Sequence, residues 1–260
     1  MMWFINTRPQ ERADGLTTVL ATAGFEVKNL PLLQLIACPW NHTLAELYRQ
    51  LLDTQMIVVV SPTAVRIGMQ YLQQAGMSLQ QLVHIQWVAV GKTTAQALAE
   101  YGIRSHVPEV ETSEGMLNLP LFDTSRGLKK VAFWRGEGGR QFMMQHLQQQ
   151  DIQILNFVLY QRHCPAETAT LFSELMDTLK QQPFSVWVLI TSEASWLNWL
   201  SLSQQYQLNL SLCHFLVLGQ RLFDLLNSYP DIQADLKVSQ LADLQPATIL
   251  QLIATLQGES

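Results

Sequence analysis

The segment Met56-Ile57-Val58-Val59-Val60-Ser61-Pro62-Thr63-Ala64-Val65 joins a short apolar run to a helix start. The run has the length of a strand and shows no alternation of apolar and polar residues, so both of its faces are expected to be buried. Ser61 supplies a side-chain oxygen for a helix N-cap, and Pro62 suits the first helical position. A buried strand that leads directly into a helix is the building unit of a parallel α/β sheet.

Apolar runs alternate with amphipathic segments on both sides of this unit. Gly24, Gly76 and Gly102 each follow a helical stretch, as expected for left-handed C-caps. The pattern predicts parallel sheets that are covered by helices on both faces. The other predicted strands are 3–7, 25–30, 86–90, 131–134, 152–159, 186–191 and 215–218, and the predicted helices are 10–23, 64–74, 93–101, 139–149, 167–181, 222–228 and 247–256.

Matching segments reveal an internal repeat. Arg8 with its following helix recurs as Arg135 with its following helix, 127 residues later. Residues 58–61 match residues 189–191, and the Val-Gly pair at 90–91 matches the Leu-Gly pair at 218–219. The repeat units therefore follow one another along the chain in the order A-B-A-B.

Two pairings of these units would complete two domains. Either the chain splits into residues 1–130 and 131–260, or the central B–A block is inserted into a domain made by the two ends. The equivalent segments 30–33 and 158–161 both follow an A unit, as two connections to an inserted domain would. We therefore predict two similar doubly wound parallel-sheet domains of the flavodoxin-like type. The predicted bounds are 1–31 with 165–260 for the first domain, 38–157 for the inserted domain, and 32–37 and 158–164 for two linker strands.

Charge and cysteine content argue against several classes of protein. The 260 residues include 16 Lys and Arg against 21 Asp and Glu, and the net charge of −5 disfavours a broad nucleic-acid-binding face. No apolar run approaches the roughly 18–20 residues of a membrane helix, and the first residues do not resemble a signal peptide. Three widely spaced cysteines without a CxxC pair, and six scattered histidines, indicate neither a disulfide framework nor a metal site. We expect a reduced, cytoplasmic protein.

The segment Arg135-Gly136-Glu137-Gly138-Gly139-Arg140 is the strongest candidate for anion binding. It follows an apolar run and precedes a helical stretch, so its glycines would let backbone N–H groups approach an anion. Its spacing matches neither G-x-G-x-x-G nor G-x-x-x-x-G-K-[ST], which disfavours a dinucleotide or P-loop site. A tight strand-to-helix turn with solvated arginines explains the same residues equally well, and both interpretations stay open.

Hydroxyl side chains recur where predicted strands give way to helices. Ligands of open α/β sheets bind beyond the carboxyl ends of the strands, so these helix starts are candidates for binding a polyanion. Ordinary N-capping is the alternative for each of them. Tyr160, on a predicted linker strand, offers either a phenol as a proton donor or a ring that packs against the linker. The hydroxyl candidates are Ser61, Thr94, Ser113, Thr191 and Ser192.

A series of short motifs runs along the chain in a specific order. The motifs are Asn6-Thr7-Arg8-Pro9, Leu30-Pro31-Leu32, Val60-Ser61-Pro62-Thr63-Ala64-Val65, Ala89-Val90-Gly91-Lys92-Thr93-Thr94-Ala95, Ser113-Glu114-Gly115-Met116-Leu117, Arg135-Gly136-Glu137-Gly138-Gly139-Arg140, Val158-Leu159-Tyr160-Gln161-Arg162 and Ile190-Thr191-Ser192. In this order and spacing, the chain resembles the uroporphyrinogen-III synthase family over essentially its whole length.

The resemblance implies an activity as well as a fold. It implies two α/β domains joined by a two-stranded linker, and the cyclisation of linear hydroxymethylbilane to uroporphyrinogen III. Water is lost and the last pyrrole ring is inverted, and the product feeds haem, sirohaem and cobalamin synthesis. The resemblance implies no metal or organic cofactor, and it gives Tyr160 the role of general acid. It implies that the substrate carboxylates are bound by Arg8, Ser61, Thr94, Ser113, Arg135, Gly136, Arg140, Thr191 and Ser192.

One position departs from the family pattern. Many relatives carry a threonine two residues after the glycine of the second B unit, where this chain has Arg221. Arg221 either pairs with a substrate carboxylate or is a solvated helix residue, and both stay open. The resemblance further implies a monomer that binds a linear tetrapyrrole and neither nucleic acid nor a membrane. Transient contact with the preceding bilane-forming enzyme is compatible with a short-lived substrate.

Two other functional classes remain as alternatives. One is a non-catalytic two-domain protein that binds a small anion, and the other is a glycosyltransferase with two Rossmann-like domains. The sequence shows no aromatic platform near the strand ends for the first, and no acidic nucleotide-binding residue for the second. Formation of the type III isomer from hydroxymethylbilane separates the synthase from both alternatives.

Overall fold

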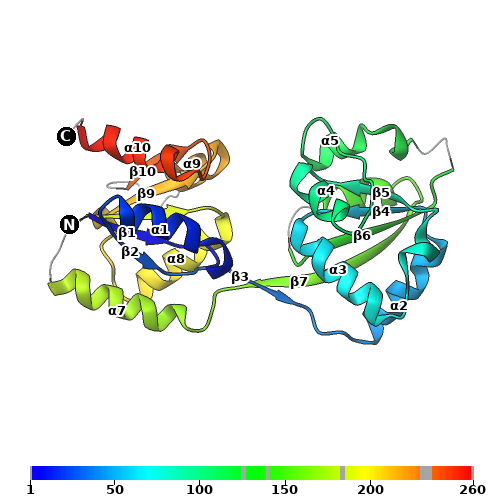
Figure 1. The fold of residues 1–260 in the computed structure, drawn as a ribbon, viewed down its shortest axis with the longest axis horizontal. Coiled ribbons are helices and arrows are strands. Elements are labelled where there is room, and N and C mark those ends of the chain that lie inside the picture. Colours follow the sequence, from blue (N-terminus) through cyan, green and yellow to red (C-terminus); the bar gives the residue numbers. More distant parts are fainter. Residues whose placement is uncertain (1, 124–126, 139–140, 182–184, 229–235, 259–260) are drawn as a thin grey trace. The chain divides into compact units, whose positions relative to one another are not determined.

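The computed structural model of the chain describes residues 2–123, 127–138, 141–181, 185–228 and 236–258. The chain forms two compact units. Unit 1 comprises Met1–Gln34 and His163–Ser260, and unit 2 comprises Leu35–Arg162. Each unit has a central sheet with helices on both faces (Figure 1), so the predicted α/β class with two doubly wound sheets is confirmed.

Unit 1 contains a five-stranded sheet in the order β10-β9-β8-β1-β2. Its four strand pairs are all parallel. Counted along the unit, the order is 2-1-3-4-5, which is that of flavodoxin-like sheets. Its elements are β1 (Met2–Asn6), α1 (Asp14–Thr22), β2 (Phe25–Asn29), α7 (Thr168–Gln181), β8 (Val186–Ile190), α8 (Glu193–Gln205), β9 (Cys213–Leu218), α9 (Gln220–Asn227), β10 (Lys237–Leu241) and α10 (Pro246–Gly258).

Two apolar layers cover the sheet of unit 1. On one face, α1 and α10 contribute Leu20 and Ile253 to a cluster with Phe4 of β1. On the other face, α7, α8 and α9 pack a second cluster against Ile5 of the same strand. Because neighbouring side chains of a strand point to opposite faces, Phe4 and Ile5 of β1 enter different cores. This explains why β1, β8 and β9 contain apolar residues at consecutive positions.

Unit 2 repeats this design with a different last strand. Its sheet has the order β3-β7-β6-β4-β5, in which β5, β4, β6 and β7 pair in parallel. The fifth place, beside β7, is taken by β3, which begins at the end of unit 1. Its elements are β3 (Gln34–Ala37), α2 (His42–Arg49), β4 (Met56–Val59), α3 (Pro62–Gln74), β5 (Gln86–Ala89), α4 (Lys92–Ala99), α5 (Ser113–Leu117), β6 (Lys130–Gly136), α6 (Phe142–Gln148) and β7 (Gln153–His163).

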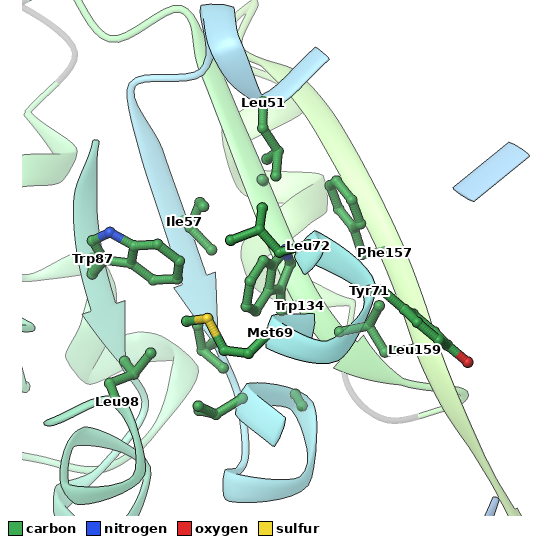
Figure 2. Packing of buried hydrophobic residues seen from close by; sticks show 14 of the residues in the cluster. Leu51, Ile57, Met69, Tyr71, Leu72, Trp87, Leu98, Trp134, Phe157 and Leu159 are labelled. Carbon is green, nitrogen blue, oxygen red and sulfur yellow. The ribbon is translucent and has the colours of Figure 1, made fainter. Parts of the chain in front are cut away.

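Trp134 of β6 is central to the larger core of unit 2. Figure 2 shows its ring among side chains from β4, β5 and α3. The ring centroids of Trp134 and Trp87 lie 5.3 Å apart in an edge-to-face arrangement. A methyl group at Gly68 would lie 2.2 Å from Cε3 of Trp134, so α3 approaches β6 this closely only because residue 68 has no side chain. The opposite face of the sheet is covered by α5 and α6.

The strand registers confirm the A repeat. Asn6 pairs with Asn29 between β1 and β2, and Phe133 pairs with Asn156 between β6 and β7, 127 residues later on both strands. The B repeat is shifted by one residue from the sequence alignment. Ser61 and Ser192 are the equivalent N-caps, because each accepts a hydrogen bond from the backbone N–H three residues later, at 3.1 Å.

The predicted elements need further corrections, beginning with α2, which was not predicted. β10 was not predicted, because its residues are partly polar and alternate only weakly. β6 continues through Gly136, beyond the predicted end at residue 134. α6 begins at Phe142, so the glycine-rich segment after Arg135 does not open a helix directly. Among the described residues, no helix is both long enough and apolar enough to span a bilayer.

Candidate functional site

A hollow of about 150 Å³ lies at the carboxyl ends of β4, β5 and β6 in unit 2. The sheet order reverses between β4 and β6, and ligands of doubly wound sheets bind at such a point. Apolar side chains form most of the wall, and two arginines and a serine provide its polar groups. The lining residues are Val60, Val90, Ser113, Met116, Phe133, Arg135, Gly136, Gly138, Met143, Met144 and Arg162.

Tyr160 lies beside this hollow, on β7. Its side chain is 2% exposed, and its hydroxyl lies 3.0 Å from Oγ of Ser61. A Cβ atom at Gly136 would be 2.4 Å from the tyrosine ring, so glycine at the end of β6 makes room for the ring. The ring is therefore packed, as one sequence interpretation expected, and the hydroxyl reaches the start of α3. The role of Tyr160 as a proton donor stays a prediction.

Arg135 ends β6 with a buried guanidinium group. The residue is 6% exposed, its Nε donates to the carbonyl oxygen of Gly136 at 3.2 Å, and its Nη2 donates to that of Gly138. Burial and the nearby Arg162 lower the pKa of Arg135, and Tyr160 acts in the opposite direction. The group still carries its positive charge at neutral pH, because the ordinary pKa of arginine lies far above neutrality. Two backbone carbonyl oxygens of the glycine-rich segment thus accept hydrogen bonds from the guanidinium group of Arg135.

Arg162 was missed as a site residue by the sequence analysis. Its Nη1 donates to the carbonyl oxygen of Glu137 at 2.7 Å, and its guanidinium carbon lies 5.5 Å from the ring centroid of Tyr160. The signal was present in the sequence, since residues two apart on a strand share a face and Arg162 follows Tyr160 by two. The charge was overlooked because the segment was interpreted as a linker.

The other predicted residues of unit 2 lie in different surroundings. Ser113 is the first residue of α5 and lines the hollow, and Thr112 before it is the N-cap. Thr94 is 1% exposed inside α4 and is not among the lining residues. The start of α4 already holds a carboxylate, because Oε1 of Glu111 accepts a hydrogen bond of 3.0 Å from the Lys92 backbone N–H. Arg140 lies outside the described residues.

Unit 1 has its own polar residues at the carboxyl ends of β1 and β8. The Thr7 hydroxyl donates to the carbonyl oxygen of Leu189 across these strands. Arg8 follows, and burial together with the nearby Arg12 lowers its pKa. Ser192 caps α8, and the half-buried Thr191 precedes it.

Arg221 in α9 has a partner within unit 1. Its Nη2 lies 3.0 Å from Oε2 of Glu193, and both side chains are exposed. The structure therefore shows an exposed ion pair at the position where the family resemblance leads one to expect a threonine. Such a pair contributes little to stability, so its carboxylate is readily exchanged for another.

These groups suit an anionic ligand and a proton transfer. Unit 2 combines two guanidinium groups with a phenol in hydrogen-bond contact with a serine. No group of three or more His, Cys, Asp or Glu residues placed to hold a metal occurs in the part of the chain that the structure describes. The arginines at this edge are of a kind that binds carboxylates, and a phenol is of a kind that takes part in acid–base catalysis.

Comparison with known proteins identifies the family. The family model described as uroporphyrinogen-III synthase HemD matches residues 14–234. Uroporphyrinogen-III synthase of Salmonella typhimurium is 27% identical over 248 residues, covering 93% of this chain and 96% of that protein. The Escherichia coli enzyme of the same name is 25% identical over 247 residues, with the same shares.

Solved structures show the same fold at lower identity. A mutant uroporphyrinogen III synthase of Thermus thermophilus has a TM-score of 0.67 at 15% identity, covering 99% of this chain and 100% of that one. The Helicobacter pylori enzyme has a TM-score of 0.63 at 15% identity, covering 98% and 100%. The fold, the ordered motifs and the family match over most of the sequence agree, and the chain belongs to the uroporphyrinogen-III synthase family.

Proposed function

We propose that this chain catalyses the reaction of its family as a cyclising hydro-lyase of tetrapyrrole synthesis. It converts linear hydroxymethylbilane to uroporphyrinogen III, with loss of one water molecule and inversion of the terminal pyrrole ring. The family match over residues 14–234 is the observation that carries this proposal. The contact between Tyr160 and Ser61, beside two arginines, supports it chemically.

Tyr160 acts as the general acid in this proposal. Protonation of the leaving hydroxyl releases water and leaves an azafulvene, and the substituted carbon of the terminal ring then attacks it. The resulting spiro intermediate fragments and recloses with the ring inverted. Because the substrate cyclises spontaneously to the wrong isomer, the main task of the protein is to hold the chain in one folded shape. Proton transfer adds a smaller factor.

The carboxylates of the substrate are bound by polar groups at the carboxyl edges of the sheets. In unit 2 these are Ser61, Ser113, Arg135 and the backbone of Gly136, which the structure brings to one end of the sheet. Thr94 and Arg140 are candidates from the family resemblance alone. In unit 1 the candidates are Arg8, Thr191, Ser192 and Arg221, the last after release from Glu193.

The setting of the reaction is also part of the proposal. All three cysteines are free thiols, which suits a reducing compartment, and we place the protein in the cytoplasm as a monomer. The substrate is short-lived, and this favours its direct transfer from the enzyme that makes the bilane.

Isomer analysis tests the function. The protein is supplied with hydroxymethylbilane, the product is oxidised, and the type I and type III isomers are resolved by chromatography. We expect type III in excess, whereas an enzyme-free control gives type I. Type I alone in the presence of folded protein would contradict the synthase, and tight binding of the bilane without turnover would favour the binding-protein alternative.

A further inference from the structure

Two positively charged side chains line the hollow in unit 2. Arg135 and Arg162 both line it, and they are close enough for Arg162 to lower the pKa of Arg135. Like charges beside a partly buried space raise the free energy of the empty site. An anion that enters the space interacts favourably with both guanidinium groups and relieves that repulsion. The electrostatics of the hollow therefore favour a negatively charged occupant.

The hollow is too small for the whole substrate. Its volume is about 150 Å³, whereas sites for drug-sized ligands have about 300–1,000 Å³. Its lining includes the apolar residues Val90, Met116 and Phe133 together with the two arginines. A carboxylate on a short alkyl arm has the matching character, because its methylene groups contact the apolar wall while its oxygens reach the arginines.

Arg162 is held by contacts with a backbone carbonyl and an aromatic ring. It donates to a backbone carbonyl oxygen, that of Glu137, at 2.7 Å and lies over the ring of Tyr160. Across the described residues, Arg162 forms no ion pair with a carboxylate. These contacts orient the guanidinium group, and a planar guanidinium can bind a carboxylate along one edge through two parallel hydrogen bonds.

We propose that Arg162 is a substrate-binding residue which, with Arg135, holds one carboxylate side chain of the tetrapyrrole in the unit 2 hollow. The inference rests on the proposed function and adds a residue and a subsite to it. The pyrrole ring that carries this side chain is thereby placed next to Tyr160, which contacts both Arg162 and Gly136.

Replacement of Arg162 tests whether this residue contributes to substrate binding, measured by KM, or to the chemical step, measured by kcat. The carboxylate is bound equally before and during the reaction, so its loss raises KM and leaves kcat nearly unchanged. For Arg162→Gln we expect the KM for hydroxymethylbilane, measured through type III formation, to rise about tenfold. Arg162→Lys keeps the charge without the planar fork, and we expect an intermediate KM.

A matched control removes a different arginine of the same unit. Arg49 in α2 is exposed and pairs with Glu46 at 2.6 Å, so Arg49→Gln makes the same change in net charge away from the hollow. We expect its KM to equal that of the unaltered protein. Increasing salt should raise KM less steeply in Arg162→Gln than in the Arg49→Gln control, because one screened contact has already been removed.

The outcomes distinguish the inference from the function on which it rests. Type III formation with an unchanged KM and salt dependence in Arg162→Gln overturns the subsite and leaves the synthase intact. Absence of type III formation by the unaltered protein overturns the function itself. If circular dichroism shows that Arg162→Gln is unfolded, Arg162→Lys decides: an unchanged KM and salt dependence in that folded variant also overturns the subsite.

Discussion

Tyr160 has a buried ring and a hydroxyl with a defined partner. The ring fills the space left by the missing side chain of Gly136, so its position depends on β6 and β7 keeping their register. The hydroxyl meets Ser61, which also accepts the backbone N–H of Ala64. One serine oxygen therefore connects a helix cap to the proposed acid, and the two roles of Ser61 are separable by substitution.

Tyr160→Phe keeps the packed ring and removes only the hydroxyl. We expect kcat for type III formation to fall roughly tenfold to a thousandfold, because the proton donor is lost, while the melting temperature stays close to that of the unaltered protein. Ser61→Ala is the companion variant, and it should lose about 0.5–2 kcal/mol of stability with the helix cap. Undiminished turnover by folded Tyr160→Phe removes Tyr160 as the acid.

His214 of β9 gives a second prediction at a single side chain. Its ring stacks on Trp187, with 4.4 Å between centroids, and its Nε2 lies 2.9 Å from Oγ of Ser239. Burial, and then the nearby Lys237, lower the pKa of His214. The unfolded chain therefore takes up a proton at a higher pH than the folded protein does.

The sign of the pH effect follows from this difference. The contribution of His214 is fully present above about pH 6.5, the ordinary pKa of histidine, and is lost as the pH falls through the lowered value. We expect urea unfolding to give a lower free energy at pH 5.5 than at pH 7.5, and a smaller difference for His214→Gln. The control is His84→Gln, which removes an exposed imidazole. Equal pH dependence in the two variants would rule out His214 as the cause.

At the scale of elements, the sequence predicted those helices and strands that have a clear apolar pattern or recognisable cap residues. Ser61-Pro62 predicted the start of α3, and the glycine positions predicted helix ends, with positive φ at Gly24, Gly76 and Gly102. β10 was missed because its pairing with β9, a distant contact, stabilises a weakly patterned segment. Arg162 was missed because its segment was interpreted as a linker, although its neighbour Tyr160 is on the same strand. Its contact with the Glu137 carbonyl was not readable from the sequence, since it forms only when β6 and β7 pair.

The contact between α3 and β6 gives a prediction at this scale. Gly68→Ala adds a methyl group within 2.2 Å of Trp134, so helix and strand must move apart. We expect a loss of about 1–3 kcal/mol of stability, as for other overpacked cores. The same substitution at Gly15 in α1 meets no atom within 4 Å and should be stabilising by up to about 1 kcal/mol.

Urea unfolding followed by circular dichroism measures both variants. The expected result is opposite signs for one chemical change at two helical glycines. Equal stabilities for Gly68→Ala and the unaltered protein would show that the indole of Trp134 can shift without cost.

At the scale of the whole molecule, the order of repeats determines which part of the chain can fold alone. Unit 2 is one continuous segment with both of its apolar layers, whereas unit 1 needs both ends of the chain. We propose that the units are folding domains. A fragment of residues 35–162 should unfold cooperatively and give a dispersed NMR spectrum.

The complementary fragment serves as the control. Residues 163–260 lack β1, whose edge pairs with β8 from Trp3 to Asn6, and we expect that fragment to remain unfolded. A folded fragment 163–260, or an unfolded fragment 35–162, would contradict this assignment of domains.

The division of unit 1 between the two ends of the chain also matters during protein synthesis. β1 and β2 leave the ribosome first, but β8, the strand that pairs with β1 on its other side, is made about 160 residues later. At about 5–20 residues per second, that interval is roughly 10–30 s. Throughout it, the apolar residues Phe4 and Ile5 have no completed core to enter, while unit 2 can already fold. The nascent chain therefore carries β1 and β2 without a completed core until β8 has been made.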